Sequence, residues 1–175
     1  MSTLRRWTII VVALVLVAGA GFFLSGCQRS NEKSAEKMME NAIAKATGGK
    51  ADVDIKGGKV SIKTKEGTSE FSTSGGEWPG DLTVDVPKIE GKVKGVIRSS
   101  EQNRKHWTIA VEGVEEGAFD KYIDGLKEKG WTIAFNATSQ EGGSAQATKD
   151  KDMVLVGYSK SQKTMTLSVT TGIIE

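Results

Sequence analysis

The chain carries a single thiol, and its position limits the chemistry available to it. Cys27 is the only cysteine among 175 residues, so the chain can form neither an intrachain disulfide nor a multi-cysteine metal site. It follows Leu24-Ser25-Gly26 and precedes a polar, charged segment, which is a poor setting for a buried core residue. The reaction that this setting favours is acylation of the sulfur.

The residues before Cys27 have the order of a bacterial secretion signal. Arg5 and Arg6 supply positive charge, and the run from Trp7 to Leu24 has no charged residue. Leu-Ser-Gly-Cys is typical of a lipobox, which predicts cleavage between Gly26 and Cys27. Acyl chains on Cys27 would anchor the protein to membrane lipid. The alternative is an uncleaved transmembrane helix, because the uncharged run from Trp7 to Leu24 could just span a bilayer.

Both readings place the body of the chain outside the cytoplasm, at the cell membrane or the outer membrane. The signal resembles those of lipoproteins from double-membrane bacteria, and this resemblance implies sorting to the outer membrane if the cell has one, because Gln28 stands where an Asp would favour retention. The two Arg of the signal account for the excess of 24 basic over 22 acidic residues. The mature chain is therefore charge-balanced, which argues against a nucleic-acid partner.

Other residues offer little that is specific to catalysis. His106 is the only histidine, and we interpret it as an exposed or turn residue. A Ser-His-Asp triad stays open as an alternative, because geometry and not chain order defines one. No nucleophile elbow or phosphate-binding loop occurs in the sequence. We expect no catalytic residue, no cofactor and no metal.

Two pairs of aspartates and three tryptophans need an interpretation. The pairs Asp52/Asp54 and Asp150/Asp152 are interpreted as solvated charges, with a weak cation site as the alternative. Trp107 and Trp131 are in phase with buried strand positions and are expected in the core. Trp78 lies among Gly and Pro residues and is the candidate for a binding surface, because exposed aromatic rings bind sugars and peptides.

The elements that must position these residues follow from the pattern of apolar side chains. A helical stripe near the N-terminus is formed by Ala35, Met38, Met39, Ala42, Ile43 and Ala46. Alternating residues then predict a β-meander that ends near Phe71. The expected regions are a signal peptide (1–26), an acylated cysteine and tether (27–33), a helix plus meander (34–73), a strap pinned over the core (74–91) and an α+β domain (92–175).

The last region predicts an antiparallel sheet with one helix packed on it, in the order β-β-α-β-β-β. The helix is expected to begin near Glu115 and to bury Phe119, Tyr122, Ile123 and Leu126. The strands are expected at 93–97, 107–111, 131–137, 154–156 and 164–171, with a loop at 141–144.

The chain resembles a family of bacterial lipoproteins that has no assigned activity. The matching stretches are Ala46-Thr47-Gly48-Gly49-Lys50, residues 58–64, Trp78-Pro79 with Asp85-Val86-Pro87-Lys88, and Trp107-Thr108-Ile109 followed by residues 122–131. The resemblance implies a lipid-anchored N-terminus and a small α+β domain. It implies no catalytic residue.

These observations predict a membrane-anchored, non-enzymatic envelope lipoprotein that acts as a binding or interaction module. Its partner would be a protein or the cell wall, reached through sheet edges or the strap. The alternatives are a small extracytoplasmic hydrolase built around His106, and a structural spacer without a specific ligand. The sequence does not predict the oligomeric state.

Overall fold

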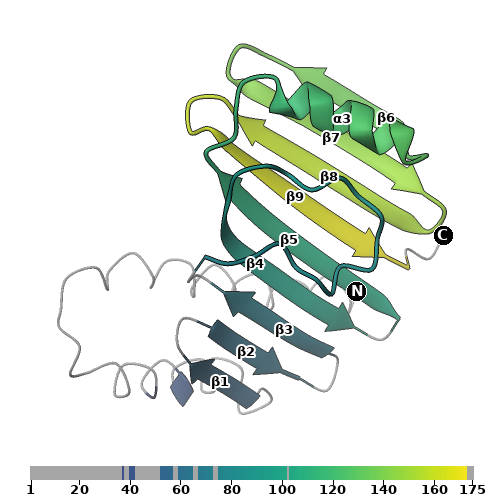
Figure 1. The fold of residues 1–175 in the computed structure, drawn as a ribbon. Coiled ribbons are helices and arrows are strands. Elements are labelled where there is room, and N and C mark those ends of the chain that lie inside the picture. Colours follow the sequence, from purple (N-terminus) through teal and green to yellow (C-terminus); the bar gives the residue numbers. More distant parts are fainter. Residues whose placement is uncertain are drawn as a thin grey trace, which may run out of the picture.

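A single antiparallel sheet forms the centre of the molecule (Figure 1). The computed structural model describes residues 37, 40–41, 52–56, 59–64, 67–72, 75–101 and 103–172. Within them, nine strands pair in the order β1-β2-β3-β4-β5-β9-β8-β7-β6. The strands are β1 (Asp52–Lys56), β2 (Lys59–Lys63), β3 (Gly67–Ser72), β4 (Lys92–Glu101), β5 (Arg104–Glu112), β6 (Thr132–Thr138), β7 (Gly142–Lys149), β8 (Asp152–Ser159) and β9 (Thr164–Thr171).

The helix α3 (Ala118–Glu128) and the strap cover the same face of this sheet, which we call the helix-side face (Figure 1). The apolar stripe predicted for this helix is confirmed, since Phe119, Tyr122, Ile123 and Leu126 are all buried. The helix begins three residues later than expected. Gly117 has a φ of 81°, which closes a turn at Glu115–Gly117 and makes Ala118 the first helical residue.

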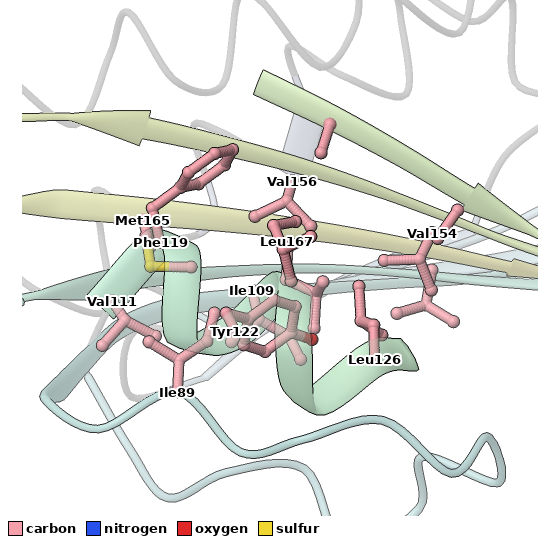
Figure 2. Close-up of a cluster of buried hydrophobic side chains, with 14 of the residues drawn as sticks. Ile89, Ile109, Val111, Phe119, Tyr122, Leu126, Val154, Val156, Met165 and Leu167 are labelled. Atoms are coloured by element: carbon pink, nitrogen blue, oxygen red, sulfur yellow. The ribbon is translucent and has the colours of Figure 1, made fainter. Parts of the chain in front are cut away.

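The core forms where α3 meets the central strands (Figure 2). Every second residue of β5 and β9 points toward the helix-side face, and the register sets these side chains in rows across the two strands. Trp107 and Trp131 are both buried there, as the sequence predicts. The fully buried members with the largest side chains are Ile109, Leu126, Met165, Leu167, Val111, Val114, Val154 and Val169.

Strand β7 corrects the predicted order of elements. The sequence prediction places a loop at residues 141–144 and no strand between residues 137 and 154, but Gly142–Lys149 is a full strand between β6 and β8. The C-terminal order is therefore β-β-α-β-β-β-β. The residues of β7 that face the helix are Gly143, Ala145 and Ala147, and their small size brings α3 close to the sheet.

The strap, residues 75–91, lies over the helix-side face without regular secondary structure, as expected. Ile89 is buried, and four other strap residues are partly buried against the core: Trp78, Leu82, Val84 and Val86. At its start, Gly76 forms an isolated bridge with Val93 at the beginning of β4. The strap therefore leaves β3, crosses the sheet and returns to β4.

The apolar side of the sheet changes at β4. In the row that joins Val60, Phe71 and Ile97, the apolar residues point away from α3. Beyond β4, the buried residues point toward α3 instead. The predicted meander is thus confirmed as a hairpin with one apolar and one charged face, and β3 pairs with β4 to continue the sheet. The predicted signal, the tether and all residues of the N-terminal helical stripe lie outside the described residues.

A substitution at Gly143 tests the close approach of α3 to β7. A Cβ atom there would lie 2.7 Å from the Phe119 ring, so Gly143→Ala must displace a buried side chain. We expect a loss of about 1–3 kcal/mol in the free energy of unfolding, measured by chemical denaturation. Gly157→Ala on neighbouring β8 is the matched control, because a Cβ there meets nothing within 4 Å. Equal stability of the two variants would contradict this packing.

Candidate functional site

A hollow of about 670 Å³ lies beside the start of the strap. The helix-side face of β1 to β3, which carries charged residues, forms one wall, and the strap residues Gly75 to Gly80 form another. Trp78 lines it, as do three acidic and three basic side chains: Asp54, Glu70, Glu77, Lys56, Lys59 and Arg98. The hollow thus combines one large aromatic ring with charges of both signs.

The strand register orders these charges. Asp54, Ser61, Glu70 and Arg98 lie directly opposite one another across β1, β2, β3 and β4. The next row carries Lys56, Lys59 and Ser72. Because residues opposite each other in antiparallel strands share a face, this wall presents acids in one row and lysines in the next. Such a surface suits an extended polar ligand or a protein segment with both charges.

Asp81 fixes the strap beside the hollow. Its carboxylate accepts hydrogen bonds from Arg98 Nε at 3.0 and 3.1 Å and from Trp107 Nε1 at 3.3 Å. Burial raises the pKa of Asp81, but the hydrogen bonds from Trp107 and Arg98 and the positive charge of Arg98 outweigh it and leave the pKa below its ordinary value. The carboxylate therefore stays ionised near neutral pH and holds the strap to β4 and β5.

Asp85 makes a second attachment further along the strap. Its backbone oxygen accepts a hydrogen bond from Trp131 Nε1 at 3.0 Å, and its carboxylate accepts one from Lys129 Nζ at 2.6 Å. The hydrogen bond from Lys129 lowers the pKa of Asp85. Lys149 Nζ in turn donates to the backbone oxygen of Lys129 at 2.7 Å. The end of α3, β7 and the strap are thereby joined.

Trp78 is placed by the strap at the rim of the hollow, half-buried against the core. The predicted binding residue therefore does line a concave surface, although part of its ring also supports the fold. Asp81 and Arg98 were missed by sequence reasoning. Arg98 directly follows the predicted strand 93–97 and Asp81 lies in the strap, so no local pattern marks either residue, and their pairing depends on how the strap crosses the sheet.

His106 lies on the face opposite the helix, away from the hollow. Its Nδ1 is 2.9 Å from Thr170 Oγ1 and its Nε2 is 3.0 Å from Thr108 Oγ1, which is itself 3.3 Å from Ser168 Oγ. The residue is half-buried on a strand, so the expectation of an exposed or turn histidine is wrong. Burial lowers the pKa of His106, so the ring is neutral at pH 7.

The two aspartate pairs singled out in the sequence have different surroundings in the structure. Asp52 and Asp54 share one face of β1, as predicted, and Asp54 lies 3.7 Å from Lys56 Nζ. Asp152 accepts a hydrogen bond from the backbone N–H of Gly172 at 3.3 Å, whereas Asp150 sits in the preceding turn with a φ of 53°. In the part of the chain that the structure describes, no three His, Cys, Asp or Glu residues gather as metal ligands would.

No protein-family model, curated protein or solved structure matches the chain. Among the residues that the structure describes, no helix has both the length and the apolar character needed to cross a membrane. The predicted cleavage site at Gly26 and Cys27 lies outside those residues.

The lowered pKa of His106 predicts a specific dependence of stability on pH. Between the ordinary value of 6.5 and the lower value in the folded state, the unfolded chain binds a proton that the folded protein does not. The contribution of neutral His106 to the free energy of unfolding is therefore fully present above pH 6.5 and is lost as the pH decreases below that value. His106→Gln should remove this step from unfolding free energies measured between pH 7.5 and 5.5. Since the chain has no other histidine, an unchanged step in the variant would exclude this origin.

Proposed function

We propose that the chain is a lipid-anchored envelope lipoprotein whose sheet and strap form a binding module at the membrane surface. The lipid anchor is inferred from the sequence Leu24-Ser25-Gly26-Cys27, which follows an uncharged run. The membrane is the cell membrane or the outer membrane, and acylated Cys27 is the point of attachment. The proposed family is that of the bacterial lipoproteins that the sequence resembles.

The hollow beside Trp78 supports the binding role and gives it a location. Two fixed attachments of the strap, through Asp81 and Asp85, hold the aromatic ring next to the charged face of β1 to β3. A binding surface built in this way is preorganised, so little conformational freedom is lost when a partner binds. The partner would be a protein segment or cell-wall polymer that offers both charges or many hydroxyl groups.

The hydrolase alternative would require His106 to connect a carboxylate with a nucleophile. The described partners of the ring are the hydroxyl groups of Thr108 and Thr170 instead. A neutral imidazole donates from one nitrogen and accepts at the other, so these two hydroxyls satisfy the ring. The arrangement favours a role in stabilising the sheet, and the non-enzymatic function remains our proposal.

Replacement of the cysteine tests the anchor. Cells that express Cys27→Ala should release the protein from the membrane fraction, and the variant should fail to incorporate an alkyne-labelled palmitate that labels the unaltered chain. The physical reason is that the acyl chains supply the buried methylene groups that hold the protein in the leaflet. A Cys27→Ala variant that stays in the membrane would instead establish the uncleaved helical anchor.

Charge reversal tests the hollow without disturbing the core. Lys59→Glu and Glu70→Lys change exposed lining residues, and Thr166→Lys on the opposite face of β9 is the control. After chemical cross-linking in intact membranes, partners captured by the unaltered chain should be lost from the first two variants and kept by the control. Partners that remain with all three variants, or are lost from all three, would place the contact elsewhere.

A further inference from the structure

The two edges of the sheet differ in how they are protected. At one edge, β1 carries Asp52, Asp54 and Lys56, and the backbone N–H of Ile55 donates to the carboxylate of Glu40 at 3.1 Å. At the other edge, β6 belongs to a stretch from Trp131 to Gln140 that contains neither charge nor proline. Charged side chains and covering segments are the usual devices that keep edge strands from pairing. Only β1 has them.

Of the two most exposed large apolar side chains, one lies on this edge strand and the other lies on β8, two strands further in. Phe135 is 53% exposed and Leu155 is 43% exposed, and they are the exposed large hydrophobic residues of the described chain. Both lie on the face opposite α3, in one row across three strands with Gln146 between them. Single exposed apolar residues are common on protein surfaces, so the edge backbone of β6 is the stronger indication of a contact with another chain.

Part of β6 is regular enough to pair a further strand. A bulge lies between Ile133 and Phe135, and a bulge interrupts regular strand pairing where it occurs. Beyond it, the four residues from Phe135 to Thr138 continue without interruption against Gln146 to Gly143. The segment available for pairing is therefore Phe135–Asn136–Ala137–Thr138.

We propose that this segment pairs with the same segment of a second copy of the chain, in antiparallel orientation about a two-fold axis beside Asn136. Phe135 and Ala137 lie on the same face of the strand, so each Phe135 is then opposite the small Ala137 of the other copy. The two Asn136 side chains meet on the other face, where an amide can both donate and accept a hydrogen bond.

The absence of charge favours a second copy over a charged partner strand. A charged side chain placed opposite Phe135 would lose water without gaining a counter-charge on β6, which is unfavourable. The same uncharged segment has no such cost, and a two-fold axis brings identical patches together. Because only three residues, Phe135 to Ala137, pair on each side of this axis, we expect a weak dimer that forms in a concentration-dependent way.

Disulfide trapping tests the pairing directly. The full chain in a non-ionic detergent is oxidised as Asn136→Cys, as Asp54→Cys on the opposite edge, and unaltered, so that Cys27 alone gives the background. Cysteines close to the two-fold axis come within disulfide distance, so Asn136→Cys should form a covalent dimer well above the other two samples. A dimer that forms equally or better through Asp54→Cys, or no dimer above the background, would overturn the proposal.

Two matched lysine substitutions separate edge pairing from stacking of sheet faces. Phe135→Lys places a charge on the edge, whereas Leu155→Lys makes the same change on the same face but on an interior strand. Sedimentation of the full chains should show the dimer dissociation constant raised about tenfold or more by Phe135→Lys and little changed by Leu155→Lys. Equal loss in both variants would assign the contact to the face, and a monomeric unaltered chain would exclude the dimer.

Discussion

The indole N–H groups of two buried tryptophans determine where the strap lies. Trp107 and Trp131 are both core residues, and each needs a hydrogen-bond acceptor inside an apolar environment. The strap supplies both acceptors, the carboxylate of Asp81 and the backbone oxygen of Asp85. Without the strap, two polar groups would be buried without partners, so the core and the strap form together.

This arrangement connects packing with the proposed site. The carboxylate that satisfies Trp107 also binds Arg98, whose side chain lines the hollow. The wall of the hollow is thus held by interactions that also stabilise the core, and the lining residues available to a partner are the exposed charges of β1 to β3. On this surface Asp81 and Arg98 stabilise the fold, whereas the exposed charged side chains of β1 to β3 would contact a partner.

Sequence reasoning predicted the parts of this fold that depend on strong periodicity. The stripe of α3, the meander and the burial of Trp107 and Trp131 follow from apolar side chains at regular spacing. Strand β7 was missed because its inward residues are Gly143, Ala145 and Ala147, whose size is set by the helix above them. The small residues do alternate with polar ones, but this weak pattern becomes meaningful only with α3 in place.

The candidate site was predicted only in part, for a related reason. Trp78 stands out by its type, whereas Asp81 and Arg98 gain their roles from a contact between segments 17 residues apart in the chain. The partners of His106 on β5 and β9 also come together only through the strand order. Local patterns can indicate pairing between consecutive strands, but they do not show that strands far apart in the sequence, such as β5 and β9, lie side by side.

The change of apolar side at β4 has a consequence for how the molecule unfolds. β4 contributes apolar side chains to two hydrophobic layers, one on each face of the sheet. Val93 and Val96 point toward α3, and Ile97 points away from it. The two hydrophobic layers share no other described strand, and the backbone hydrogen bonds of β4 join them. Amide exchange should therefore distinguish two cooperative units, with the unit of β1 to β3 opening at lower free energy than the unit under α3.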